Sequence, residues 1–335
     1  KKNGSELKSV IAAAGRTPPD WYDATPLDYP QSLDLTWPQK PPGGWNNQKN
    51  VGQYIWDIIN PNPGRWRSGV RFMHYMLSVH KDDPAMSQRI MNELGRMYCE
   101  LLQDYARAAF WYEQARVGKG SPFDGGKSGA HLAECYWRLG NRKTAVDLMN
   151  KLPLTFSLIK LWGDIGDTDK CVQLAAGSIG SARFPAMHYL VIGDAYRVAG
   201  DYPKAMSAYQ KALDAAGKSS EKQDAKFKQR AQSNMAGLQL LAGIDLKNVR
   251  DGAYRASSVG YEGPVEVEVR VDGSRIEEVR VTQHHEKQFY SSITDMPAKI
   301  VEKQGFKGVD ATSGATLTSE AIINASAKAL ADGTK

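Results

Sequence analysis

The stretch from Asp310 to Ser319 holds the residue types best suited to chemistry in this chain. Ser313, Gly314, Ala315 and Thr316 are small residues ahead of a helical pattern, which predicts a tight turn at a helix start. Free amides and the positive end of a helix dipole make such a place suited to an anion. A hydroxyl at Thr316 could therefore carry or contact a phosphate. The pattern by itself fits an ordinary helix cap at least as well.

The residues around this turn predict a small α+β unit that would position it. Valines alternate with charged residues over 264–271, which predicts a half-buried strand. Asp272-Gly273 is a turn signal, and a second strand is expected over 276–281. Asp295 as N-cap, with Pro297 in the first turn, predicts a helix that ends at Gly305. A final alanine-rich helix is expected to turn four apolar residues inward: Ile322, Ile323, Ala327 and Leu330.

This C-terminal unit resembles the FMN-binding domain family, which includes flavin-bearing subunits of the Rnf complex and of the sodium-translocating NADH:quinone oxidoreductase. The family pattern at the flavin attachment site is an acid, two further residues, and then Ser/Thr-Gly-Ala-Thr. The sequence Asp310-x-x-Ser313-Gly314-Ala315-Thr316 satisfies it. The likeness also extends to earlier segments, namely Asp251–Tyr254, Gly260–Val265, Asp272-Gly273, His285-Glu286 and Gln304.

The resemblance implies that FMN is the cofactor and that a flavin transferase attaches it covalently. The transferase would use FAD as donor, with a divalent metal, and link the FMN phosphate to the hydroxyl of Thr316 as a phosphoester. Thr316 is then an attachment point, and no catalytic residue is expected. Asp310 would help the transferase or shape the loop.

Further cofactor contacts follow from the same resemblance. Around the phosphate and the ribityl chain we expect Ser313, Gly314, Ala315, Leu317 and Thr318. Near the isoalloxazine ring we expect Glu286 with His285. The family often continues after this Glu with Thr-Pro, whereas Lys287-Gln288 follow here. Because the sequence departs from the family pattern in this loop, the resemblance does not support a ring contact from the residues that follow Glu286.

Upstream, the sequence predicts two further segments: a Pro/Trp-rich N-terminal arm over 1–66 and a helical repeat domain over 67–246, followed by the FMN-binding domain over 247–335. The arm holds nine of the 16 prolines and five of the eight tryptophans. Proline spacing predicts an extended chain there. Its aromatic residues would pack on the helices that follow or contact a partner.

The spacing of small and large residues over 192–212 resembles a tetratricopeptide repeat, and weaker copies precede it. The expected fold class is thus an all-α tetratricopeptide-like solenoid followed by a small α+β domain with an antiparallel sheet. Such an array usually binds a peptide or protein, although it also serves as a rigid spacer. A polar-faced helix over 221–242 would cap the array.

Composition restricts the remaining possibilities. The net charge of +6 is scattered, so no nucleic-acid partner is expected. No apolar run approaches the ~18 residues of a membrane span, so no transmembrane segment is expected in this chain. Cys99, Cys135 and Cys171 lack metal-ligand spacing, and His284-His285 lack companion ligands, so we expect buried thiols and no metal site.

The expected function is that of an extracytoplasmic electron-transfer flavoprotein rather than a substrate-specific enzyme. It would be periplasmic or secreted to the cell surface after removal of a signal peptide, and associated with a membrane through its partners. Those partners would be the flavin transferase and a redox protein, soluble or membrane-bound, docked by the helical repeats. Two alternatives remain open: an adaptor whose FMN-type domain is structural or binds FMN loosely, and a flavin reductase acting on a small molecule.

Overall fold

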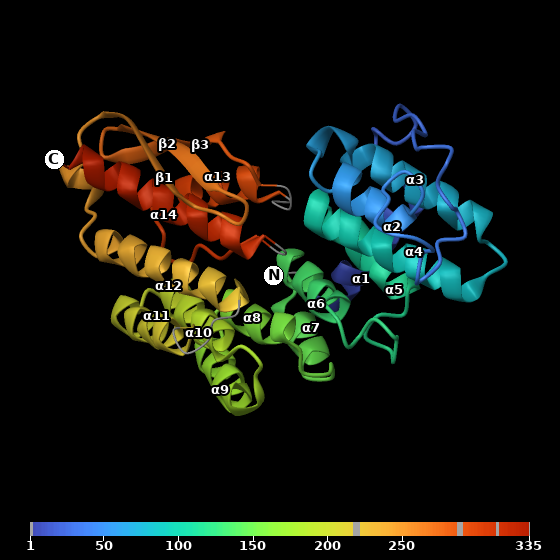
Figure 1. The fold of residues 1–335 in the computed structure, drawn as a ribbon, viewed down its shortest axis with the longest axis horizontal. Coiled ribbons are helices and arrows are strands. Elements are labelled where there is room, and N and C mark those ends of the chain that lie inside the picture. The colour runs from blue at the N-terminus through green and yellow to red at the C-terminus, as the bar shows by residue number, and fades with distance from the viewer. Residues whose placement is uncertain (1–2, 217–221, 287–290, 313–314, 335) are drawn as a thin grey trace. The chain divides into compact units, whose positions relative to one another are not determined.

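The computed structural model describes residues 3–216, 222–286, 291–312 and 315–334. The chain forms two compact units, Lys1–Leu158 and Ile159–Lys335. Figure 1 labels their elements.

The first unit is helical. Its consecutive helices α4 and α5, and likewise α6 and α7, pack together as hairpins. Asp83, Asp104 and Asn141 cap the starts of α4, α5 and α7 through their side chains, which accept hydrogen bonds from first-turn amides. The elements are α1 (Gly4–Arg16), α2 (Val51–Tyr54), η1 (Ile55–Ile59), η2 (Pro63–Arg65), α3 (Trp66–Val79), α4 (Pro84–Arg96), η3 (Met97–Leu101), α5 (Tyr105–Gln114), α6 (Ser128–Arg138) and α7 (Arg142–Met149).

The N-terminal arm differs from expectation at its start. It begins with helix α1, which has a side-chain capping box, whereas the proline-rich residues that follow have no long helix or strand. Three aromatic residues of the arm pack on α3 and α4, which confirms the packing interpretation for them, whereas Trp45 and Trp56 are exposed. The contacts are Tyr22 with His74, Tyr29 with Phe72, and Trp37 with the Arg89 guanidinium at 3.9 Å.

The second unit starts with helices that continue the hairpin pattern. They are α8 (Phe156–Asp164), which crosses the boundary between the units, α9 (Thr168–Ser178), η4 (Ile179–Ser181), α10 (Pro185–Ala199), α11 (Tyr202–Ala216) and α12 (Lys222–Leu241). α10 packs closely on α11 because Gly193 has no side chain: a Cβ there would lie 2.4 Å from the Tyr209 ring. Gly200 ends α10 in the left-handed conformation, at φ 80°.

After η5 (Leu246–Asn248), three antiparallel strands form a sheet in the order β1-β2-β3. They are β1 (Gly252–Val259), β2 (Pro264–Asp272) and β3 (Arg275–Gln283), and the last two confirm the predicted hairpin. Alternate valines of β2, from Val265 to Val271, are buried. Helix α14 (Thr316–Gly333) packs on β1 and β2, and α13 (Ser292–Lys303) packs on β3.

Two details differ from the sequence prediction. The strand β1 was not predicted, because its residues alternate only weakly in polarity. Helix α13 begins at Ser292 rather than after Asp295. Asp295 is therefore not the N-cap but lies in the first turn, where its carboxylate pairs with Lys299 and accepts a hydrogen bond from Thr312.

Helix α12 lies between α11 and α14 (Figure 1). It was expected to cap the helical array with a polar face, but α14 covers that face. A single hydrophobic cluster joins Leu190, Tyr209 and Leu238 of the helices to the valines of β2. The predicted boundary between the helical repeat domain and the FMN-binding domain, at residues 246 and 247, lies inside this second unit. This domain boundary stays a prediction.

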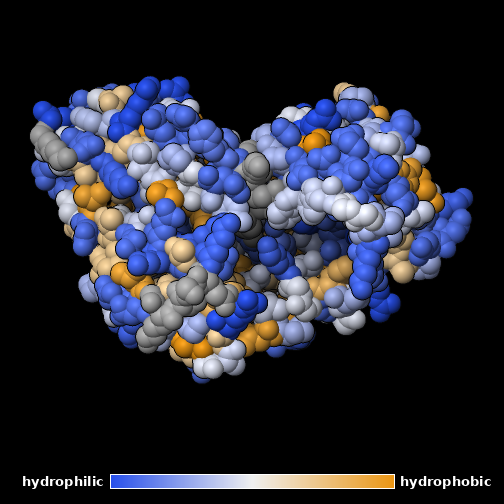
Figure 2. Space-filling view, in the orientation of Figure 1, coloured by the Kyte–Doolittle hydropathy of each residue, from blue (hydrophilic) through white to orange (hydrophobic). Residues whose placement is uncertain are grey.

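The coarse fold prediction, a helical region followed by a small antiparallel sheet with helices, is confirmed. All three cysteines are free and buried, as expected. On the face shown in Figure 2, hydrophilic residues predominate and hydrophobic ones are scattered. Within the part of the chain that the structure describes, no helix combines the length and the apolar character that crossing a membrane requires.

Candidate functional site

The predicted attachment residue, Thr316, is the first residue of α14 and is partly exposed. Ala315 precedes it as N-cap and is buried. Among the described residues, no side chain caps this helix start, so its first-turn N–H groups and the positive end of the helix dipole face the loop. Ser313 and Gly314 lie outside the described residues. An anion next to Thr316 would therefore meet a favourable electrostatic environment.

Asp310 is buried at the start of this loop, only 5% exposed. The Lys299 ammonium lies 3.2 Å from one Asp310 carboxylate oxygen and 2.9 Å from an Asp295 carboxylate oxygen. Thr312 donates a hydrogen bond of 2.6 Å to the Asp295 carboxylate. One lysine thus joins helix α13 to the loop through two carboxylates. The ion pair with Lys299 therefore holds the Asp310 carboxylate in place without a cofactor.

Ser319 fixes the other end of the loop. Its hydroxyl accepts a hydrogen bond from the Thr312 amide at 3.0 Å and donates one to the Ala315 carbonyl at 2.8 Å. The side chain is fully buried. Sequence reasoning assigned no role to Ser319 or Lys299. The four-residue spacing of Asp295 and Lys299, which places them on one helix face, was the signal available for the lysine.

Glu286, expected near the isoalloxazine ring, is also buried. Its carboxylate accepts hydrogen bonds from the amides of Tyr261 and Glu262, at 3.0 and 2.9 Å, and from the Thr318 hydroxyl. These bonds tie the loop between β1 and β2 to the first turn of α14. His285, beside it, is exposed. A contact of either residue with the flavin stays a prediction.

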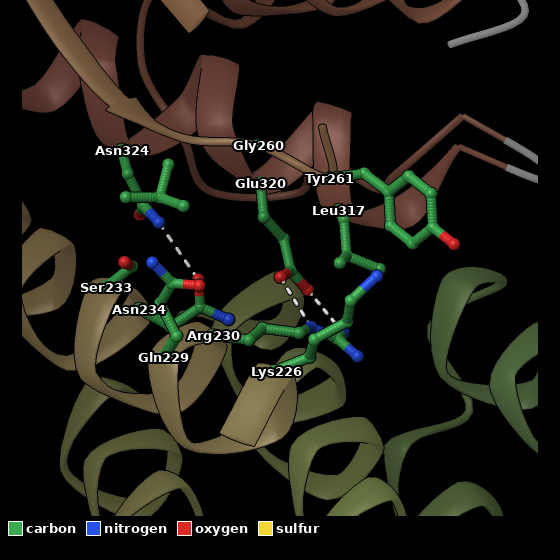
Figure 3. Close-up of a pocket in the computed structure, with 11 residues that line it drawn as sticks. Lys226, Gln229, Arg230, Ser233, Asn234, Gly260, Tyr261, Leu317, Glu320 and Asn324 are labelled. Carbon is green, nitrogen blue, oxygen red and sulfur yellow. Dashed lines mark hydrogen bonds and ion pairs between the residues drawn. The ribbon is translucent and has the colours of Figure 1, made fainter. Parts of the chain in front are cut away.

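A cavity of about 60 Å³ opens beside this first turn, between α12 and α14. Figure 3 shows the side chains that line it. They come from three segments: Lys226, Gln229, Arg230, Ser233 and Asn234 of α12; Val259, Gly260 and Tyr261 at the end of β1; and Leu317, Glu320 and Asn324 of α14. Leu317, one of the expected cofactor contacts, is thus on the cavity wall. Of the predicted site residues, Thr316, Leu317 and Thr318 lie in the first turn of α14, and Glu286 reaches this turn through Thr318. A part for α12 was not expected.

Buried charges hold the two walls of the cavity together. Arg230 pairs with Glu320 through two hydrogen bonds, of 2.6 and 2.5 Å, and with Asp194 of α10 at 2.7 Å (Figure 3 shows the Glu320 pair). Burial by itself would lower the pKa of Arg230, but the Glu320 and Asp194 carboxylates more than offset it, so its pKa is raised. The guanidinium is charged at any accessible pH.

Comparison with known proteins finds a family match in the C-terminal part of the chain. Residues 260–331 match the FMN-binding domain family. This match supports FMN as the cofactor. The match contains Glu286, Asp310 and Thr316, whereas α12 lies before it.

A relative from Treponema pallidum (strain Nichols), described as an uncharacterized protein, is 40% identical over 84 residues. The aligned part covers 24% of this chain and 23% of that protein, so the chain spans about a quarter of the relative it matches. The helical region of the first unit lies outside the FMN-binding match.

The residues present fit FMN in two respects. A partly exposed threonine stands at a helix start that no side chain of the described residues caps, which suits a phosphate ester. Asn234 of α12 is buried and lines the neighbouring cavity, and its Nδ2 atom has no hydrogen-bond partner among the described residues. The cavity of about 60 Å³ is open to solvent, so one edge of a ring system would fit in it while the rest lies outside.

Proposed function

We propose that this chain is a flavoprotein electron carrier whose FMN is attached through a phosphoester to Thr316. The observation that carries the proposal is the position of Thr316, partly exposed at the start of α14, where none of the described side chains caps the helix, within the FMN-binding match. When bound, FMN supplies one- and two-electron transfer, which the protein's own side chains lack.

The attachment step conserves atoms with FAD as the donor. The Thr316 oxygen would bond to the phosphorus on the flavin side of FAD, the bond between the two phosphates would break, and AMP would leave with its phosphate. The threonine proton goes to solvent or to a base of the transferase. In this chain, the α14 amides would receive the ester's negative charge, and the Lys299–Asp310 pair would hold the loop.

Electrons must then enter and leave through other proteins. The helix hairpins α4/α5, α6/α7 and α10/α11 support the proposal of a tetratricopeptide-like array, a type of scaffold that commonly binds protein partners. We place a redox partner on this array, together with the flavin transferase as a transient partner. Covalent attachment would suit a location outside the cytoplasm, where a dissociated FMN would be lost.

Two observations favour the adaptor as a second candidate. The Glu286 carboxylate accepts three hydrogen bonds from the protein itself, and the cavity of about 60 Å³ does not enclose a whole flavin. In an adaptor, the FMN-type domain would be structural and the helices alone would bind a partner.

Co-expression with a flavin transferase separates the two candidates. The electron carrier predicts a yellow protein whose fluorescence survives a denaturing gel, is lost in Thr316→Ala and persists in Thr334→Ala. It also predicts reversible bleaching and reoxidation of the bound flavin. A colourless wild-type protein under conditions that load a known acceptor of the same transferase supports the adaptor.

A further inference from the structure

The cavity between α12 and α14 has a donor that the protein itself leaves unused. Asn234 is only 3% exposed. Its Oδ1 atom accepts a hydrogen bond of 2.9 Å from the side-chain Nδ2 of Asn324 (Figure 3). Its own Nδ2 atom has no partner among the described residues. A buried donor without an acceptor costs about 1–3 kcal/mol, so a ligand oxygen placed here would be favoured.

The same face of α14 connects this cavity to Thr316. Thr316, Glu320 and Asn324 are spaced by four residues, so they lie along one side of the helix. Glu320 and Asn324 line the cavity. The rise from Thr316 to Asn324 is on the order of 12 Å at 1.5 Å per residue. A long group attached to Thr316 and lying along this face therefore reaches the cavity.

We propose that this cavity binds the pyrimidine edge of the flavin attached at Thr316, and that α12, outside the FMN-binding match, supplies the side chains that recognise it. The proposal rests on the proposed function. The pyrimidine edge of an isoalloxazine carries two carbonyl oxygens and an N–H group, whereas the opposite edge carries methyl groups. The free donor of Asn234 selects the edge that has acceptors, and the cavity takes one edge only.

Lys226 adds a charge at this edge. Its ammonium group lies 4.1 Å from the centroid of the Tyr261 ring, on the cavity wall. Arg230, the other cation there, is paired with Glu320 and Asp194. Because reduction adds negative charge to the pyrimidine part of a flavin, a nearby ammonium stabilises the reduced form. Lys226 therefore raises the reduction potential of the bound FMN.

The test uses the full chain loaded with FMN and two matched pairs of variants. Asn234→Asp keeps the acceptor for Asn324 and removes the donor, and Gln232→Glu makes the same exchange at an exposed position of α12. Lys226→Met removes the ammonium, and Lys228→Met does so at an exposed position. Time-resolved anisotropy of flavin fluorescence measures whether the ring is held, and a redox titration measures the midpoint potential.

We expect the mobile fraction of the flavin to at least double in Asn234→Asp and to stay unchanged in Gln232→Glu. We expect the potential to fall in Lys226→Met and not in Lys228→Met. A ring that is already mobile in the wild type, or equal behaviour within each pair, overturns the proposal. Lys226→Met keeps this test valid if Asn234→Asp fails to fold.

Failure of the attachment itself gives a different result. If wild-type protein gains no FMN mass with an active transferase, the proposed function fails, and the unloaded chain is titrated with riboflavin. Saturable binding that weakens at least tenfold in Asn234→Asp, and not in Gln232→Glu, supports the cavity as a flavin site. Absence of saturable binding overturns it.

Discussion

Arg230 of α12 and Glu320 of α14 form a buried two-pronged ion pair, with distances of 2.6 and 2.5 Å, across the contact between the helices and the FMN-binding region. The side chains are 9% and 5% exposed. Asp194 and Tyr209 extend the network into α10 and α11, with a hydrogen bond of 2.7 Å between them. Helices α10, α11 and α12 thus belong to the same compact unit as the sheet, and α12 forms one wall of the cavity.

Removing Arg230 should therefore destabilise the whole second unit. Arg230→Met leaves the Glu320 and Asp194 carboxylates buried without their cation, which costs about 3–5 kcal/mol in unfolding free energy. Arg255→Met, which breaks an exposed pair with Glu268, should cost little. Urea unfolding followed by circular dichroism measures both. Equal losses of unfolding free energy in the two variants would show that the buried ion pairs stabilise the unit no more than the exposed pair does.

The close approach of α10 and α11 can be tested at Gly193. Gly193→Ala places a methyl group against the Tyr209 ring, and overpacking of this kind costs about 1–3 kcal/mol. Gly177→Ala in α9 meets nothing within 4 Å and should stabilise the helix by about 0.5–1 kcal/mol. Thermal unfolding of the two variants should move in opposite directions. A neutral Gly193→Ala would argue against tight packing of this hairpin.

Lys299 should be a positioning residue for the attachment loop. Lys299→Met leaves the Asp295 and Asp310 carboxylates without their shared ammonium, so we expect the loop to shift, stability to fall by about 2 kcal/mol and FMN loading to slow. Lys303→Met, exposed on the same helix, is the control. The rate of mass gain with transferase, measured beside urea unfolding, checks this. Loading at the wild-type rate in Lys299→Met contradicts the role.

His74 predicts a pH dependence in the first unit. Burial, with the nearby Arg71, lowers the pKa of His74 from 6.5 to about 4. The folded state therefore favours the neutral ring, and its contribution is complete above pH 6.5 and is lost as the pH falls towards 4. The loss amounts to about 2 kcal/mol at pH 5. His74→Phe should remove this part of the dependence, whereas His285→Phe, at an exposed position, should not.

Urea unfolding at pH 7.5 and pH 5 measures the His74 effect as a difference between variants, so other titrating groups cancel. If wild type and His74→Phe differ in unfolding free energy by the same amount at both pH values, the folded state does not hold the His74 ring neutral.

Local patterns predicted the β2–β3 hairpin, the final helix and the place of Thr316, because alternation and helix-start residues act within a few positions. The pattern missed β1, whose residues are stabilised by pairing with β2 and by packing under α14. It also misread α12. The polar face of this helix, which holds Arg230 and Asn234, was expected to cap the array. Contacts with Glu320 and Asn324, which are distant in the sequence, bury that face instead. Lys299 was missed for the same reason, since its second carboxylate, Asp310, lies in another segment.

Intact mass after co-expression with a flavin transferase shows whether Thr316 carries FMN. We expect a gain equal to FMN minus water in wild type and in Thr334→Ala, and no gain in Thr316→Ala, with the added mass on the peptide that contains Thr316. A wild-type chain that stays unmodified by an active transferase, or a Thr316→Ala chain that still gains the mass, would contradict it.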